Sequence, residues 1–335
     1  MNIQYSGAPL RLKKSTLGLA LLAVTGAALL NACAESAEQV SVDTVQQVTK
    51  TVERYEVIQT LSAQGRTVLG GTQTGVVTVS TDGGSSWLRQ RVSSTASFID
   101  SAFCQDGSAA MLDVYNTVWT SSGDFKDWLP SKFDKPSSPV AIECHSSGLW
   151  VVGSGSNLIN STDQGKTWRV VSFDEDAQFT ALTFTSDTHG IAFGEFGMLA
   201  FTNDGGQTWQ RGEPIAGDFY TYDALFTDPS TGYATGLAGQ VLKTSDGGVT
   251  WARLVNTTET PLYRLFMHAG APHGAGANGT LARLEGDQWV RVAYDSPVLS
   301  FLGAAVSGSQ SIVVGGPGGL LRTVQSSNLS QADPS

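Results

Sequence analysis

The sequence predicts an all-β fold, a seven-bladed β-propeller of four-stranded blades, and three observations lead to this prediction. A motif of the form "TNDGGQTW" recurs along the chain about every 40 residues. Each repeat contains four short apolar runs broken by Gly, Asp and Ser, and none shows the long 3.6-residue periodicity of a helix. About 280 residues follow the N-terminal region, which is enough for seven such units.

The motif is present in four intact copies and two degraded ones. The intact copies pair Asp82 with Trp87, Asp163 with Trp168, Asp204 with Trp209, and Asp246 with Trp251. The degraded copies, "TSSGDFKDW" and "ARLEGDQW", end at Trp128 and Trp289. A seventh unit, from Val298 to Ser327, keeps the rhythm but lacks the acid and the tryptophan.

Each residue of the motif has a structural task in a turn between the third and fourth strands. The carboxylate of Asp204 is expected to accept N–H groups of the turn, and Gly205 and Gly206 supply the positive φ angles that the turn requires. Trp209 opens the outer strand and is expected to bury its ring between blades. Because a catalytic site needs one constellation in one place, this repetition argues against a catalytic role for the motif.

The N-terminal region predicts export. Basic residues precede a long uncharged apolar run, which is typical of a secretory signal, with a short transmembrane anchor as the alternative. Residues 30–33, "LNAC", resemble the bacterial lipoprotein box, which implies that residues 1–32 are a signal peptide and that Cys33 is lipidated. We therefore expect a lipid-anchored protein at the periplasmic face of the outer membrane.

The domain boundaries follow from the repeats. Residues 33–38 are expected to be a tether, 39–327 the propeller, and 328–335 a disordered tail. The last unit runs out of chain after its third strand, so residues 39–52 are the candidate for the strand that closes the ring. Their valines also fit a helical spacing, and a strand is the favoured interpretation.

Charge and composition exclude several functions. Residue 32 is followed by 17 basic and 30 acidic residues, and this negative charge argues against nucleic-acid binding, because phosphate contacts need clustered Lys and Arg. No Cys or His spacing predicts a metal site, no cofactor motif is present, and His268 and His273 are expected to be a solvated loop pair. Cys104 and Cys144 either form a disulfide or remain two buried thiols.

The repeated motif resembles the Asp-box, or bacterial neuraminidase repeat. That resemblance implies Asp-box turns on a propeller, in enzymes and non-enzymes alike. A sialidase-like or glycan-binding propeller is the alternative function, and it predicts a central cluster of acids, Arg and Tyr. Arginines mostly follow the blade tryptophans, which places them on outer strands. Arg264 is the exception on an inner strand, so no arginine triad is predicted.

Two long stretches, "GEFGMLAFTNDGGQTW" and "GLAGQVLKTSDGGVTW", resemble the photosystem II stability and assembly-factor propellers. The resemblance implies a non-catalytic protein, without a central acid/base pair, that binds a membrane-protein or envelope-complex subunit and assists its assembly. One departure is that the family's arginine-rich binding patch has no counterpart in this acidic chain.

A partner is expected at the end of the propeller that carries the loops between second and third strands and between blades. Exposed aromatic residues beside charges are typical of interfaces, with packing between blades as the alternative. The candidates are Glu195, Phe196, Tyr220, Tyr222, Tyr263 and Arg264, together with the acidic run Asp174, Glu175 and Asp176.

Overall fold

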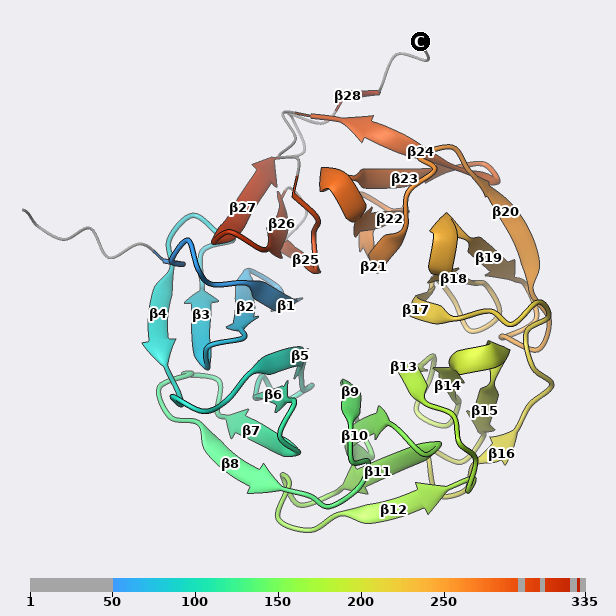
Figure 1. The fold of residues 1–335 in the computed structure, drawn as a ribbon, viewed down its shortest axis with the longest axis horizontal. Coiled ribbons are helices and arrows are strands. Elements are labelled where there is room, and N and C mark those ends of the chain that lie inside the picture. Colours follow the sequence, from blue (N-terminus) through green and yellow to red (C-terminus); the bar gives the residue numbers. More distant parts are fainter. Residues whose placement is uncertain (1–50, 295–298, 308–310, 326–329, 332–335) are drawn as a thin grey trace, which may run out of the picture. The chain divides into compact units, whose positions relative to one another are not determined.

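The structure, a computed structural model, describes residues 51–294, 299–307, 311–325 and 330–331. These residues all lie in the second of two compact units of the chain, Thr49–Ser335. Within this unit, antiparallel sheets stand around a central axis as in a propeller, which confirms the all-β prediction with four-stranded sheets (Figure 1). The predictions for the signal peptide, Cys33, the tether and the C-terminal tail lie wholly or mostly outside the described residues.

Each repeat runs from the axis to the perimeter (Figure 1). The first strands, next to the axis, are β1 (Ile58–Gln64), β5 (Phe98–Phe103), β9 (Pro139–His145), β13 (Phe179–Phe184), β17 (Thr221–Phe226), β21 (Leu262–His268) and β25 (Gly303–Ser307). The second strands are β2 (Thr67–Thr72), β6 (Ala109–Asp113), β10 (Gly148–Gly153), β14 (Gly190–Gly194), β18 (Gly232–Gly236), β22 (Ala271–Gly276) and β26 (Ser311–Gly316). The third strands are β3 (Val76–Ser80), β7 (Thr117–Ser121), β11 (Asn157–Ser161), β15 (Leu199–Thr202), β19 (Val241–Thr244), β23 (Leu281–Glu285) and β27 (Leu320–Gln325).

The fourth strands form the perimeter, and short 3₁₀ turns interrupt three repeats. These strands are β4 (Leu88–Arg91), β8 (Leu129–Lys132), β12 (Arg169–Ser172), β16 (Gln210–Arg211), β20 (Ala252–Asn256) and β24 (Gln288–Ala293). The 3₁₀ turns, each between a second and a third strand, are η1 (Glu195–Gly197), η2 (Leu237–Gly239) and η3 (Ala277–Gly279).

The sheets are simple antiparallel meanders. Strands β1–β4, β5–β8, β9–β12 and β13–β16 make four separate four-stranded sheets. Strands β17–β20 and β21–β24 join through a parallel pair between β20 and β24, and β28 (Ser330–Gln331) pairs with β24. Among the described residues the last sheet has three strands, β25–β27. Of the segment expected to close it, only Thr51 and Val52 are described, and both lie in a bend.

The core lies between neighbouring sheets. In the β1–β4 and β9–β12 sheets, the second and third strands are buried almost throughout because a sheet covers them on either side, whereas the fourth strands are mostly exposed. One core cluster joins Leu69 and Val77 of the first sheet to Phe98 and Met111 of the second. The repeats therefore stabilise one another, and each of them alone would leave two apolar faces in water.

The repeated motif forms a hydrogen-bonded turn. The Asp204 carboxylate accepts the N–H of Thr208 at 2.9 Å and its hydroxyl at 2.6 Å, and the Thr202 hydroxyl donates to it at 2.8 Å. These bonds from Thr208 hold the pKa of Asp204 down at about 2. The corresponding carboxylates accept the same pair of bonds in the other three intact copies, at Asp82, Asp163 and Asp246.

The tryptophan of the motif lies against the preceding sheet. The ring centroids of Trp209 and Trp150 are 5.5 Å apart, and Trp150 belongs to β10 of that sheet. Gly206 has a φ of 89°, and a Cβ at this position would stand 2.1 Å from the Trp150 ring. Turn conformation and lack of space thus both require glycine here.

Cys104 and Cys144 form a disulfide, with 5.1 Å between their Cα atoms. The two residues lie just after β5 and in β9, so the bond ties the inner strands of neighbouring sheets together. This finding decides between the two alternatives that the sequence leaves open.

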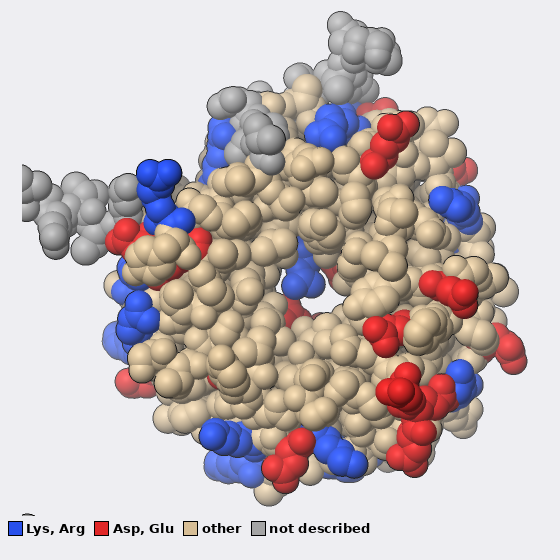
Figure 2. Space-filling view, in the orientation of Figure 1, with Lys and Arg blue, Asp and Glu red and all other residues tan. Residues whose placement is uncertain are grey.

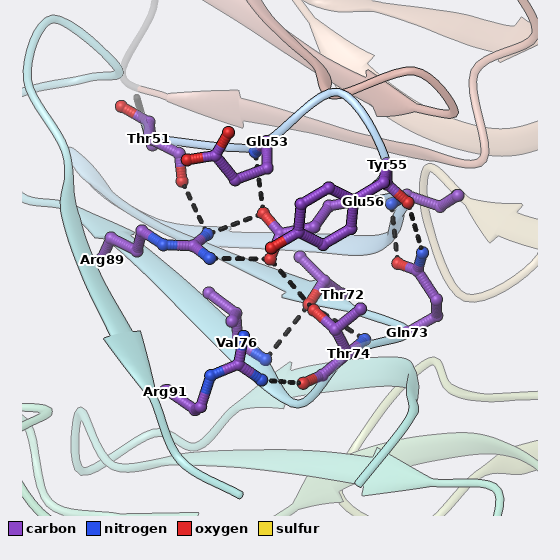
Figure 3. Close-up of polar contacts among 11 residues, drawn as sticks. Thr51, Glu53, Tyr55, Glu56, Thr72, Gln73, Thr74, Val76, Arg89 and Arg91 are labelled. Carbon is purple, nitrogen blue, oxygen red and sulfur yellow. Dashed lines mark hydrogen bonds and ion pairs between the residues drawn. The ribbon is translucent and has the colours of Figure 1, made fainter. Parts of the chain in front are cut away.

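The segment that leads into β1 is held by a buried ion pair (Figure 3). Arg89 of β4 donates two hydrogen bonds of 2.7 Å to the carboxylate of Glu56, which is fully buried. The Thr74 hydroxyl and the Glu53 N–H donate to the same carboxylate at 3.0 and 2.8 Å. A side chain of the outermost strand therefore fixes the start of the innermost one.

Candidate partner-binding face

One end of the propeller is built from the turns between second and third strands and from the connectors that lead to the next first strand. The connectors before β13 and β17 lie on either side of η1. The Glu195 N–H donates to the carbonyl of Gln178 in one connector at 2.9 Å, and the Gly197 N–H donates to the carbonyl of Phe219 in the other at 2.7 Å. The first two predicted residues, Glu195 and Phe196, are thus held at a junction of three segments.

Phe196 is presented to solvent by the backbone of η1. Its φ is 56°, in the left-handed region that side chains with a Cβ seldom adopt. The equivalent residues of η2 and η3, Ala238 and Asn278, have φ values of 55° and 53°, so the conformation belongs to the turn itself. Phe196 is 63% exposed, so most of this large apolar residue faces solvent.

The three predicted tyrosines form a contiguous group beside this junction. The ring centroids of Tyr220 and Tyr222 are 5.7 Å apart, and those of Tyr222 and Tyr263 are 5.3 Å apart, both pairs edge to face. Burial raises the pKa of Tyr220, and the nearby charge of Glu195 raises it further. The structure thus brings Glu195 and the tyrosines together, although they belong to three different repeats.

Arg264 lies in the centre of the ring instead. Its guanidinium is 3.6 Å from the carboxylate of Asp100 in β5, and its Nε donates to the carbonyl of Leu302 at 3.3 Å. Figure 2 shows basic and acidic side-chain atoms at the central opening. We call this central opening, which the first strands line, the channel. Arg264 lies in the channel, whereas its neighbour Tyr263 belongs to the aromatic group.

The channel contains three carboxyl groups that sequence reasoning missed. Asp100, Glu143 and Asp223 lie on the first strands β5, β9 and β17. Burial raises the pKa of Glu143 to about 8, with the charges of Asp100 and Asp223 adding to the effect. Burial likewise raises the pKa of Asp223 to about 6. It also raises the pKa of Asp100, and the positive charge of Arg264 opposes both increases. Central carboxyl groups beside an arginine are part of the cluster that the glycan-active alternative predicts.

The two aspartates also connect neighbouring sheets. Asp100 accepts the N–H of Ile142 at 2.9 Å, and Asp223 accepts the N–H of Leu265 at 2.7 Å, in each case from the next first strand. A register shift in β5 and in β17 ends at these aspartates. The sequence signal was an acid inside an otherwise apolar first strand, as in "FIDSAF" and "YDALF".

The acidic run lies in the connector before β13. Asp174 and Asp176 are exposed, whereas Glu175 forms an ion pair with Arg211 of β16. Figure 2 shows acidic side chains gathered on the visible end of the propeller, over the β13–β16 sheet. The predicted acids and aromatic residues therefore share one end of the molecule.

His268 and His273 do not form the solvated loop pair that was expected. They lie in the paired strands β21 and β22, are only 3% and 4% exposed, and have ring centroids 5.2 Å apart. Burial lowers the pKa of both imidazoles. Among the described residues there is no cluster of His, Cys, Asp and Glu suited to a metal ion.

A hollow of about 960 Å³ lies at the opposite end, between the β5–β8 and β9–β12 sheets. The Cys104–Cys144 disulfide, Trp128 and His145 are part of its lining. It is separate from the predicted partner-binding residues, which all lie at the other end or in the channel.

Comparison with known proteins agrees with this architecture. Residues 167–255 match the family described as photosynthesis system II assembly factor YCF48. No curated protein matches the chain. Three solved propellers share the fold at low sequence identity. The structure described as YCF48 bound to D1 peptide is 15% identical, with a TM-score of 0.64, over 82% of this chain and 93% of that chain.

Two further solved structures resemble the chain to a similar degree. YCF48 from Cyanidioschyzon merolae is 17% identical, with a TM-score of 0.62, over 82% of this chain and 97% of that one. The WD40 β-propeller domain of Doa1 is 12% identical, with a TM-score of 0.65, over 83% and 94%. Together with the family match, these likenesses confirm that the chain is a propeller similar to the photosystem II assembly factors.

Proposed function

We propose that this chain is a non-catalytic propeller that binds a protein partner and acts as an assembly or stability factor for an envelope membrane complex. One observation carries the proposal: the family match at residues 167–255 covers η1, both of its connectors, Tyr220 and Tyr222. The part of the chain that resembles an assembly factor is therefore the part that builds most of the candidate face.

The solved relative supports a peptide as the form of the partner. That protein is described as bound to a D1 peptide, and its fold is similar to this one over most of both chains. By analogy, the partner of this chain is a segment of a membrane-complex subunit that docks on Glu195, Phe196 and the tyrosine group. Arg264, which follows Tyr263 and lies in the channel, is next to this docking site.

Anchoring and ring closure complete the proposal. The chain is exported, lipidated at Cys33 and held at the periplasmic face of the outer membrane. The ring has seven blades, and residues 39–52 add the fourth strand to the β25–β27 sheet, since a three-stranded last blade otherwise leaves an unpaired edge.

Co-purification tests the proposal directly. The tagged full chain is recovered from solubilised membranes after mild cross-linking, and co-purifying proteins are identified by mass spectrometry. We expect one membrane-complex subunit with the unmodified chain and its loss with Tyr222→Ala. A Cys33→Ala variant should leave the membrane fraction. Recovery of the bait alone would contradict partner binding.

A glycan-active propeller is the second candidate, because the channel holds the acids and one arginine of the cluster that such a site predicts. Asp100, Glu143 and Asp223 lie there with Arg264, and Glu143 has a pKa suited to a general acid. Among the described first strands, however, Arg264 is the only arginine, and sialidase-like catalysis requires three. Hydrolysis of a fluorogenic sialoside, abolished by Glu143→Gln, would favour this candidate over the first.

A further inference from the structure

Acidic side chains lie on η1 and on the two connectors that flank it, before β13 and before β17, at one end of the propeller. We define the acidic aromatic face as the exposed aromatic residue and the acids around it, namely Asp174, Asp176, Glu195, Phe196, Glu213 and Asp218. We propose that this face docks a cationic, Arg- or Lys-containing segment of the protein partner. The proposal rests on the proposed function, and it adds the chemistry of the partner.

Backbone contacts establish that the acids share one surface. The connector with Asp174 and Asp176 bonds to η1 through Gln178, and the connector with Glu213 and Asp218 bonds to it through Ile215, whose N–H donates to the Gly197 carbonyl at 2.8 Å. Phe196 stands between these connectors, and Figure 2 shows the acidic side chains at this end. The acids therefore lie on η1 and on the two connectors that flank it.

The local charge is almost entirely negative. The two connectors and η1 contain six acidic residues and no Lys or Arg. The nearby Arg211 is paired with Glu175, so it does not offset the remaining carboxylates. Such a one-signed surface attracts a positive segment and repels a negative one, which sets both association rate and specificity.

The aromatic residues supply the second half of the recognition. An Arg or Lys side chain can lie over the exposed ring of Phe196, where the negative face of the ring and the neighbouring carboxylates both favour the cation. The group of Tyr220, Tyr222 and Tyr263 extends the aromatic surface onto β17 and β21, the strands that carry Asp223 and Arg264. A cationic segment with apolar residues therefore finds charge complementarity and contact area together.

Peptide binding provides a test with defined probes. Fluorescence anisotropy would compare a labelled peptide of alternating Arg and Leu with a matched peptide of alternating Glu and Leu. We expect saturable binding of the Arg peptide alone, weakened as ionic strength rises. Phe196→Asn should weaken it about tenfold, because it removes the ring while keeping a residue that suits this backbone, as Asn278 does in η3.

A matched pair of charge variants separates this face from the overall acidity of the chain. Asp176→Asn/Glu213→Gln removes two charges from the face, and Asp127→Asn/Asp187→Asn removes two exposed charges from turns at the opposite end. We expect the first variant to weaken the Arg peptide about fivefold or more and the second to change it less than twofold. Equal effects of the two variants would overturn the proposal, as would equal binding of the two peptides.

The co-purified partner distinguishes this inference from the proposed function. If Phe196→Asn and Asp176→Asn/Glu213→Gln both retain the partner while Tyr222→Ala loses it, the partner binds without a cationic segment at this face. If the unmodified chain recovers no partner, the proposed function itself fails.

Discussion

Two glutamates of this protein, the buried Glu56 and the partly buried Glu143, have opposite electrostatic environments. Burial by itself raises the pKa of Glu56, yet hydrogen bonds from Arg89, the Glu53 N–H and Thr74 outweigh burial and leave that pKa below its usual value. Around Glu143, burial and two further carboxylates act in the same direction, and its pKa rises to about 8. Donors and neighbouring charges, and not burial alone, decide whether a shielded carboxylate stays ionised.

The position of each glutamate in the propeller explains the difference. Glu56 precedes β1 and is reached by an arginine from the perimeter of its own sheet (Figure 3). Glu143 lies on a first strand, and the first strands of all sheets converge on the axis (Figure 1). Side chains from different repeats therefore meet in the channel, where Arg264 is the basic partner of Asp100.

Removal of Arg89 should have the largest effect. Arg89→Met leaves the Glu56 carboxylate buried without its main partner, and we expect a loss of about 3–5 kcal/mol in the free energy of unfolding at neutral pH. Urea denaturation measures it. Arg253→Met, on the exposed part of another fourth strand, is the matched control and should cost little. A small effect of Arg89→Met would mean that the ion pair with Arg89 does not stabilise the buried carboxylate of Glu56.

The second prediction concerns the sign of the pH dependence. Between about pH 4.5 and 8, folded Glu143 holds a proton that the unfolded chain has released, so this group lowers the free energy of unfolding as pH rises through that window. Glu143→Gln should remove this slope and gain about 1–3 kcal/mol at pH 8, after allowance for solvent screening. Denaturation midpoints across this pH range measure the slope.

Glu56 should show the reverse dependence. Its lowered pKa contributes stability that is present above about pH 4.5 and lost as pH falls below it. Glu56→Gln should therefore leave the slope between pH 5 and 8 unchanged, unlike Glu143→Gln. If the free energy of unfolding changed with pH in the same way in both variants between pH 5 and 8, the proposed difference between Glu56 and Glu143 would be wrong.

The last prediction, with the smallest effect, tests the arginine of the channel. Arg264 lowers the pKa of Asp223, so Arg264→Met should raise that pKa above 6 by roughly one pH unit, worth about 1 kcal/mol. Carboxyl ¹³C NMR titration reports the change, and Arg253→Met should leave it unaltered. An unchanged titration of Asp223 would show that Arg264 acts on Asp100 alone.

Much of the candidate face was predictable from local patterns. The "GEFG" turn places Glu195 and Phe196 on a loop, and the repeat places Tyr220 and Tyr222 at the start of a first strand. The channel acids were not recognised, because their proximity depends on strands about 40 to 120 residues apart converging on one axis. The burial of His268 and His273 was missed for a similar reason, since neighbouring sheets decide whether a strand end is covered.

The architecture is predictable from the amino-acid sequence, because a period of about 40 residues repeats the same four apolar runs and the same turn with its aspartate, glycine and tryptophan. Those features are local, and each copy supports the same interpretation. The three-dimensional arrangement was needed to establish that Cys104 and Cys144 are bonded, that Glu56 is paired, and that carboxylates from three sheets share the channel. Each of these outcomes is a distance between repeats, and such distances are set by how the sheets pack around the axis.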